Sequence, residues 1–290
     1  MLSSIAKLNK EINMSENKPT TCVAFVLDQS GSMSSTKTDA INGYNEHVQQ
    51  CRQYAKEQNI LVSLVTFNSD VYEHMWLQSV DNLQEASADN YHPDGTTAFR
   101  DALGYTIQKL SQTAPKGEDV SFLVIVFSDG AENASKHISP SILKELVDTR
   151  QKQKNWTFSY VGCGEKIVQQ VHQETGIPIS NMALWDNKTS KSTKRGMKRC
   201  AEKMNKYFAC RSVGVQAMYN YHSDVGAVAD YTQDEATSIS TGDLGNPSSI
   251  ITTPGNITLT GVIPTVPTHI EESKMPTSKV FCSTTSVTWE

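Results

Sequence analysis

Cysteine is sparse in this sequence, and its six cysteines form no C-x-x-C pair. We therefore expect neither a disulfide scaffold nor a structural zinc site, and we expect reduced thiols in a cytoplasmic compartment. Long apolar runs are also missing, since no stretch approaches the roughly 18 residues of a membrane-spanning helix. No apolar segment follows the first charged residues, so a secretory signal is not expected either.

Several motifs of catalytic sites are missing too. The sequence has no G-x-S-x-G, no G-x-x-x-x-G-K-[ST] and no H-x-x-x-H. These absences argue against a serine hydrolase of the nucleophile-elbow type, a P-loop nucleotide site and a paired-histidine zinc enzyme. An aspartyl-phosphate phosphohydrolase usually has a second acid two residues after its nucleophilic aspartate. Asp28, the candidate nucleophile, is instead followed two residues later by Ser30.

The negative charge is concentrated at one end of the chain. The net charge is −5, and residues 211–290 hold eight acidic against three basic side chains, so residues 1–210 are neutral. Bulk charge therefore gives no sign of a nucleic-acid-binding protein. Residues 191–206 do carry a basic face opposite an apolar stripe; it is either the solvated side of a packing helix or a docking surface for an acidic partner or nucleic acid.

Apolar strands alternate with amphipathic helices over the first 210 residues. The pattern predicts strands at 21–27, 60–67, 71–77, 120–127, 156–161 and 180–185, and helices at about 41–55, 97–110, 140–154, 166–174 and 192–209. This order is typical of a doubly wound α/β sheet, mostly parallel, and the closely spaced second and third strands supply one antiparallel edge strand.

Three regions follow from composition. Residues 1–19 form an N-terminal extension, residues 20–210 form the α/β domain, and residues 211–290 form a low-complexity tail. Half of the last 60 residues are Ser, Thr, Pro or Gly, so the tail has too little apolar surface to fold alone. Its short β-prone clusters leave two alternatives, disorder or an extended strand that pairs with the body or with another subunit.

Oxygen-bearing side chains gather where three predicted loops leave the sheet. Asp28, Ser30 and Ser32 follow the first strand, Thr96 precedes a helix, and Asp129 follows the 120–127 strand. Ligand sites in open α/β sheets lie beyond the carboxyl ends of the strands. Carboxylates and hydroxyls are also the oxygen ligands that Mg²⁺ accepts. The competing interpretation is that Asp28 and Thr96 only cap helices, that Ser30 and Ser32 are turn residues, and that Asp129-Gly130 is an ordinary turn.

Three motifs in this region carry a family resemblance. D-Q-S-G-S-M (28–33) resembles the D-x-S-x-S motif of the von Willebrand factor type A (VWA) domain, D-G-T-T-A-F-R-D-A-L (94–103) its threonine loop, and V-I-V-F-S-D-G (124–130) its second aspartate loop. The resemblance covers about residues 20–208. It implies a Rossmann-like VWA fold with a metal-ion-dependent adhesion site that binds Mg²⁺ (or Mn²⁺). Ser30, Ser32 and Thr96 would supply hydroxyl ligands, and Asp28 and Asp129 would act directly or through water.

The resemblance also implies a function. The metal would capture an Asp or Glu of a protein partner, which makes the chain a binding module and not an enzyme. A second hypothesis is a structural or assembly subunit whose tail adds a strand to a neighbour or to a second copy. A third is a metal-dependent hydrolase. No membrane partner is expected.

Overall fold

A single mixed sheet forms the centre of the structure, a computed structural model that describes residues 18–185, 190–217, 221, 270–271 and 285–287. Six strands make up its main part in the order β6-β5-β4-β1-β2-β3, and two short strands continue it as β8-β7. The strands are β1 (Thr20–Asp28), β2 (Asn59–Phe67), β3 (Val71–Ser79), β4 (Val120–Ser128), β5 (Trp156–Cys163), β6 (Met182–Trp185), β7 (Ile270–Glu271) and β8 (Thr285–Val287). This confirms the predicted doubly wound, mostly parallel α/β fold.

The sheet reverses its winding direction at β1. This strand pairs in parallel with β2 on one side and with β4 on the other. β4, β5 and β6 continue in parallel, whereas β3 runs antiparallel to β2 as the 60–77 pattern predicts. The order places the ends of β1 and β4 side by side at a topological switch point, where open α/β sheets bind ligands.

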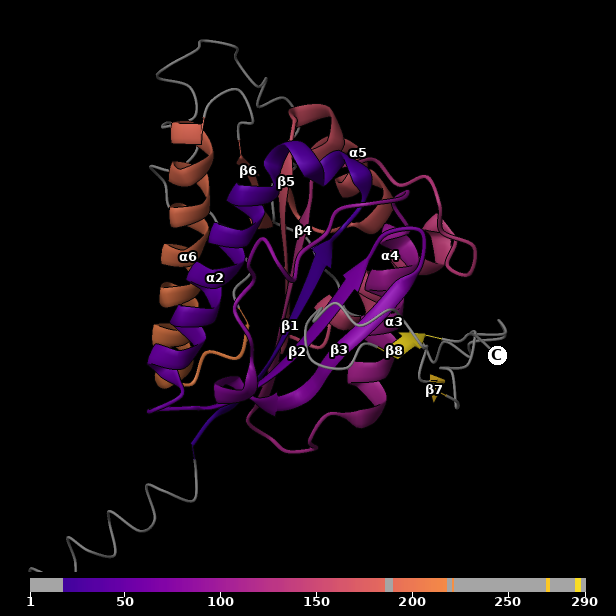
Figure 1. The fold of residues 1–290 in the computed structure, drawn as a ribbon. Helices are drawn as coiled ribbons and strands as arrows, with labels where there is room; N and C mark the ends of the chain where they lie inside the picture. The colour runs from indigo at the N-terminus through magenta and orange to yellow at the C-terminus, as the bar shows by residue number, and fades with distance from the viewer. Residues whose placement is uncertain (1–17, 186–189, 218–220, 222–269, 272–284, 288–290) are drawn as a thin grey trace, which may run out of the picture.

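Helices cover both faces of the sheet (Figure 1). α2 (Lys37–Tyr54) and α6 (Ser190–Ser212) lie side by side on one face, and α3 (Phe99–Thr113), α4 (Pro140–Gln151) and α5 (Glu165–Thr175) cover the other. The described residues also include three short 3-10 turns: η1 (Gly31–Thr36), η2 (Val80–Asn82) and η3 (Ile179–Asn181). Because both faces are covered, β1 and β4 are buried along nearly their whole length, which explains their continuous apolar runs.

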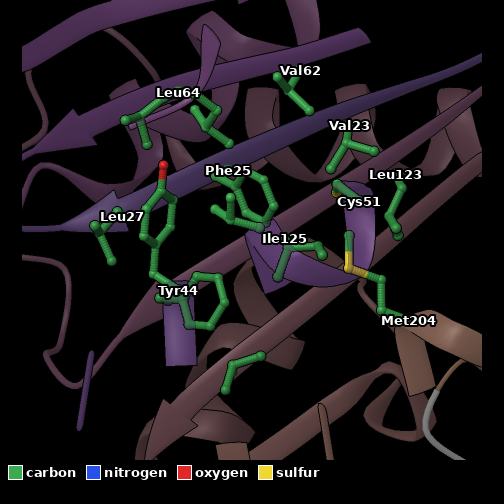
Figure 2. Packing of buried hydrophobic residues seen from close by; sticks show 14 of the residues in the cluster. Val23, Phe25, Leu27, Tyr44, Cys51, Val62, Leu64, Leu123, Ile125 and Met204 are labelled. Carbon is green, nitrogen blue, oxygen red and sulfur yellow. The ribbon is translucent and has the colours of Figure 1, made fainter. Parts of the chain in front are cut away.

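Alternate residues of β1 enter two separate cores. Val23, Phe25 and Leu27 pack on the α2–α6 side, together with Tyr44 of α2 and Met204 of α6 (Figure 2). The residues between them, such as Ala24 and Val26, join the core under α3, α4 and α5. The central strand therefore holds the two helical layers at fixed distances from each other, and the loop after it has a rigid base.

At two helix ends the structure shows why the observed boundary departs from the predicted one. α3 begins at Phe99, not Thr97, because the Thr97 amide donates to Asn133 Oδ1 at 2.8 Å and Ala98 becomes the N-cap. α4 ends at Gln151, three residues early, and the chain then takes a positive φ of 60° at Lys154. In both places a non-helical backbone conformation overrides the apolar periodicity.

The regions outside the sheet domain are only partly described. Residues 1–17 of the predicted N-terminal extension lie outside the described residues, as do the β-prone clusters at 249–252 and 257–260. The tail contributes β8, which pairs antiparallel with β3, and β7, which pairs with β8. α6 continues two residues beyond the predicted domain boundary, to Ser212. In the described part of the chain, no helix is both long and apolar enough to cross a membrane.

Candidate functional site

The candidate site lies at the carboxyl edge of the parallel strands. The loop after β1, residues 28–32, meets the loop after β4 at Asp129 and the segment before α3 at Gly95. The β2–β3 turn closes the cluster, because the Ser69 hydroxyl contacts Thr96. The structure therefore brings the three predicted loops into one place, with Thr96 in contact with Ser69 of the β2–β3 turn.

Asp28 is the buried end of β1. Its Oδ1 accepts a hydrogen bond from the Ser30 amide at 2.7 Å, and its Oδ2 accepts one from the Ser128 hydroxyl at 2.5 Å. The residue has no exposed surface. These two donors fix the orientation of the carboxyl group with respect to the loop that follows it.

The two serines link the carboxylates of the two strands. Ser30 Oγ lies 3.1 Å from Ser32 Oγ, and the Ser32 hydroxyl donates to Asp129 Oδ1 at 2.7 Å. Asp129 Oδ2 accepts a weaker bond from the Thr36 hydroxyl at 3.4 Å. Asp28, Ser30, Ser32 and Asp129 thus form one hydrogen-bonded cluster.

The two threonines of the 95–97 segment point to different neighbours. Thr96 is exposed, and its Oγ1 lies 2.8 Å from Ser69 Oγ. Thr97 is 3% exposed. A Cβ on Gly130 would lie 3.2 Å from Thr97 Oγ1 and equally 3.2 Å from Ser32 Oγ, so these two oxygens border the same small space. Thr97, which the sequence prediction did not include, is therefore the threonine that approaches the serine–aspartate cluster.

The helix-capping interpretation finds little support. Ser30 is the N-cap of η1 and Ala98 that of α3, and neither makes a side-chain capping bond. Thr96 is not an N-cap at all. Asp28 does form a local turn contact through the Ser30 amide, but its second oxygen reaches Ser128 on another strand. The polar side chains face one another instead of the helix ends.

Burial disfavours charge on both carboxyl groups. Desolvation raises the pKa of Asp28 to about 6, although the bonds from Ser128 and Ser30 lower it and the charge of Asp129 raises it further. The pKa of Asp129 is also raised, mainly by desolvation and in spite of the bonds from Ser32 and Thr36. The cluster therefore holds two carboxyl groups at an energetic cost in their ionised form.

The donor set fits a hard divalent cation. Within the described part of the chain, neither Asp28 nor Asp129 forms an ion pair with a Lys, Arg or His side chain. Two carboxylates would balance a 2+ charge, and the serine and threonine hydroxyls are neutral oxygen ligands. No group of three or more His, Cys, Asp or Glu among the described residues could hold a metal. A cation here would therefore depend on the hydroxyl oxygens.

Sequence reasoning missed three contributors. Ser128 precedes Asp129 directly, and its place at the end of a buried strand was a usable signal. Thr97 adjoins the predicted Thr96, so the residue type was found but the position was ambiguous. Tyr91 had no signal: its buried hydroxyl donates to the Asp28 carbonyl oxygen from a loop 63 residues away. Burial and the charges of Asp28 and Asp129 raise the pKa of Tyr91 well above its ordinary value, so the phenol stays protonated.

Comparison with solved structures gives distant likenesses in fold. The vWF domain of the type V pili tip protein Mfa5 from Porphyromonas gingivalis has a TM-score of 0.50 at 10% identity, covering 69% of this chain and 97% of that one. A von Willebrand factor type A structure from Catenulispora acidiphila has a TM-score of 0.45 at 14% identity, over 64% of this chain and 43% of that one. Proximal thread matrix protein 1 from the mussel byssus, in a structure with a zinc-occupied MIDAS motif, has a TM-score of 0.40 at 16% identity, over 63% and 46%. This chain thus spans less than half of the latter two.

The family assignment rests on the sequence itself. No curated protein matches the chain significantly. The model of the von Willebrand factor type A domain matches residues 23–194, which is more than half of the chain and includes every residue of the candidate site. The chain belongs to the von Willebrand factor type A domain family.

Proposed function

We propose that this chain is a protein-interaction module that depends on a divalent cation. Asp28, Ser30, Ser32 and Asp129, with a threonine hydroxyl, would hold Mg²⁺ (or Mn²⁺). When bound, the cation would supply an open coordination position for an Asp or Glu carboxylate of a partner protein. Membership of the VWA family supports the broader role in protein interaction or assembly.

One observation carries the proposal. Two carboxyl groups with raised pKa values lie in one hydroxyl-lined cluster, and neither pairs with a basic side chain of the described residues. Two neighbouring carboxylates, Asp28 buried and Asp129 half-buried, are costly to keep ionised unless a cation neutralises them. A bound cation would offset the free-energy cost of keeping the two carboxylates ionised.

We assign the threonine ligand to Thr97 rather than Thr96. The Thr97 hydroxyl borders the same space as Ser32 Oγ, whereas the Thr96 hydroxyl bonds with Ser69. The adjacent pair offers a matched comparison, because both variants, Thr97→Ala and Thr96→Ala, remove one hydroxyl and one methyl group from the same loop.

The contacts of His92, the one histidine near the site in sequence, favour a binding role over catalysis. His92 is exposed, and its Nε2 interacts with the Asp89 carbonyl oxygen at 2.9 Å. A general base must reach the proton that it removes, at hydrogen-bonding distance or through one water. His92 instead uses this nitrogen within its own loop, so we propose a binding role and no enzymatic step.

Calorimetric titration with Mg²⁺ and Mn²⁺ tests the proposal. We expect the wild type to bind, the double variant Ser30→Ala/Ser32→Ala to lose binding, and Thr97→Ala to weaken it more than Thr96→Ala. Equal binding by the wild type and the double variant would sink the site. The reverse order of the two threonine variants would return the ligand to Thr96.

The partner is tested next, with the immobilised wild-type chain and proteins of its source organism. Capture that is lost both with a chelator and in the Asp129→Asn variant supports metal-bridged recognition. Capture that persists under both conditions contradicts it, because the partner would then bind elsewhere. An acidic peptide series with Asp, Glu, Asn and Gln at one position serves as the matched chemical probe.

A second candidate function is assembly through the tail. It is favoured by β8, which adds to β3 with Ser286 opposite Tyr72 and Thr285 opposite Glu73. A β-strand that pairs with its own sheet edge can pair with the same edge of another copy. Mixing two single variants, Tyr72→Cys and Ser286→Cys, in a Cys282→Ser background distinguishes the cases. A disulfide between different chains supports strand exchange, and its absence, together with an intrachain disulfide in the Tyr72→Cys/Ser286→Cys variant, restricts β8 to its own chain.

A further inference from the structure

The connection between η2 and α3 is long and irregular. Residues 83–98 contain neither helix nor strand, yet they make directed hydrogen bonds at both ends of their path. Connections of this length without regular structure are uncommon in compact domains and usually serve a function. We call residues 83–95 the strap.

We propose that the strap is a positioning element for the loop 28–32, with Tyr91 as its positioning residue. The inference rests on the proposed metal site, since that loop carries Asp28, Ser30 and Ser32. It goes further by assigning the geometry of the metal loop to a segment that would itself contribute no ligand.

The first part of the strap is anchored on α2. Asn45 makes a two-way amide pair with Ala86: its Nδ2 donates to the Ala86 carbonyl oxygen at 2.9 Å, and its Oδ1 accepts from the Ala86 amide at 2.7 Å. Three further donors from the same helix reach strap carbonyl oxygens. They are Tyr44 to Gln84 at 3.1 Å, Arg52 to Leu83 at 2.8 Å, and Lys37 to Ala88 at 3.0 Å.

The last part of the strap contacts the metal loop residue by residue. The Tyr91 hydroxyl donates to the Asp28 carbonyl oxygen, and the Asp94 amide donates to the Gln29 carbonyl oxygen at 2.7 Å. The Gly31 amide in turn donates to the Gly95 carbonyl oxygen at 3.0 Å. The strap therefore bonds with three backbone groups of the loop 28–32: the carbonyl oxygens of Asp28 and Gln29 and the amide of Gly31.

Packing makes this contact rigid at both of its ends. Tyr91 has no exposed surface and belongs to the core between the sheet and α2. Gly95 adopts a positive φ of 77°, and an added Cβ would lie 2.7 Å from Ser69 Oγ. A Cβ on Gly31 would lie 3.3 Å from the Gly95 carbonyl oxygen. The loop 28–32 and the strap therefore approach closely at Gly31 and Gly95, where a side chain would not fit easily. The buried ring of Tyr91 fixes their relative position.

The strap therefore joins α2 to the metal loop by a continuous path of hydrogen bonds. Groups that orient metal ligands without touching the metal typically change affinity by roughly 10- to 100-fold when removed. Loosening the strap at Tyr91, or at the remote anchor Asn45, should weaken metal binding without removing any ligand.

The experiment compares Mn²⁺ affinity and hydrogen exchange in the full chain and three variants. Tyr91→Phe removes the hydroxyl but keeps the ring, and Asn45→Ala cuts the distant anchor. Asn155→Ala is the matched control, since Asn155 Nδ2 also donates to a backbone carbonyl oxygen, that of Val120, but at the opposite end of the sheet. We expect Mn²⁺ affinity to fall roughly 10-fold in the first two variants and to stay at the wild-type value in the control.

Metal-free hydrogen exchange provides the readout that separates positioning from general stability. We expect the amides of residues 29–31 to exchange faster in Tyr91→Phe than in the wild type and in Asn155→Ala. Wild-type Mn²⁺ affinity in Tyr91→Phe would overturn the inference. If the wild type bound no Mn²⁺, the proposed function would fail instead, and unchanged exchange at 29–31 would overturn the strap separately.

Discussion

At the scale of the residue, burial decides the chemistry of two titratable groups, Asp28 at the end of β1 and His47 on α2. Asp28 is held in its site although desolvation raises its pKa, because Ser128 and Ser30 donate to it. His47 of α2 lies between the rings of Phe25 and Phe127, and desolvation lowers its pKa to about 4 in spite of the Gly43 carbonyl contact. The sequence alone revealed neither shift, since both depend on what covers the residue.

His47 should make the protein sensitive to acid. The unfolded chain binds a proton at this residue near pH 6.5, whereas the folded chain binds it only near pH 4. The contribution of His47 to the free energy of unfolding should therefore fall as pH decreases across that window, by an amount on the order of 3 kcal/mol. The raised pKa of Asp28 contributes in the opposite direction, so the effect of His47 is read from the difference between the wild type and a variant without it. Urea unfolding at pH 7, 6, 5 and 4.5 measures it. Acid should lower the free energy of unfolding less in His47→Phe than in the wild type. Asp28 titrates in both proteins, so any difference between their pH profiles comes from His47, and identical profiles would contradict the assignment.

Gly130 should be a sensitive position in the candidate site. Its Cβ would enter the space between Ser32 and Thr97, so Gly130→Ala should weaken Mn²⁺ binding roughly 10-fold while the chain stays folded. Gly117→Ala is the control, because its Cβ would only reach ordinary contact with Val120 at 3.4 Å. Isothermal titration and urea unfolding of both variants separate a lost site from a lost fold. Wild-type affinity in Gly130→Ala would argue that no ion occupies this space.

At the scale of the element, the end of α6 is fastened to the amino end of β1. Arg211 is fully buried, and its guanidinium pairs with Asp119 Oδ1 at 2.8 Å while also donating to the carbonyl oxygens of Thr20 and Asp119. Gln58 adds a bond to the Phe208 carbonyl oxygen at 2.7 Å. Among the side chains of the predicted apolar stripe of this helix, Ala201, Met204 and Phe208 are buried, and Met197 lies outside the described side chains.

Removing the Arg211 side chain should destabilise the domain strongly. Arg211→Ala leaves carbonyl groups that face a vacated buried space, so we expect the free energy of unfolding to fall by about 3 kcal/mol. Arg211→Lys should recover only part of it, since lysine lacks the planar fork. Lys136→Ala is the comparison, because its pair with Asp70 is exposed and 3.9 Å long and should contribute less than about 1 kcal/mol. Equal urea midpoints for Arg211→Ala and Lys136→Ala would refute the fastening role.

At the scale of the whole molecule, the tail touches the domain through β8 on β3, beside the turn that carries Ser69. Domain and tail boundaries at 19 and 210, and cytoplasmic placement, stay predictions. The buried Tyr221, whose amide donates to Asn181 Oδ1 at 2.6 Å, shows that the domain uses at least one residue beyond α6.

Deleting residues 231–290 should separate the two proposed roles. Because Tyr221 is retained, we expect metal affinity to remain and the urea midpoint to change little. Light scattering on the full and shortened chains measures assembly. A full-length oligomer that becomes monomeric supports the assembly role of the tail, whereas the same number of subunits in both proteins contradicts it.

The sequence by itself determined the elements and the chemistry available to the site. β1 and β4 can be recognised in the sequence because strands buried on both faces must be apolar throughout. The carboxylate or hydroxyl at each strand end is then the first polar side chain after an apolar run. The three motifs then placed Asp28, Ser30, Ser32 and Asp129 in loops that a Rossmann-like sheet brings to one edge. These predictions need only the local residue pattern and the small set of topologies that α/β sheets adopt.

Only the tertiary structure decided which oxygen atoms meet. Thr96 and Thr97 are adjacent and chemically identical, and the choice between them depends on how Gly95, at a positive φ, turns the chain between Ser69 and Gly31. Tyr91 reaches Asp28 across 63 residues of sequence, and Ser128 reaches it across 100. Such contacts arise from the order of the strands and the path of the strap, and no local periodicity encodes them.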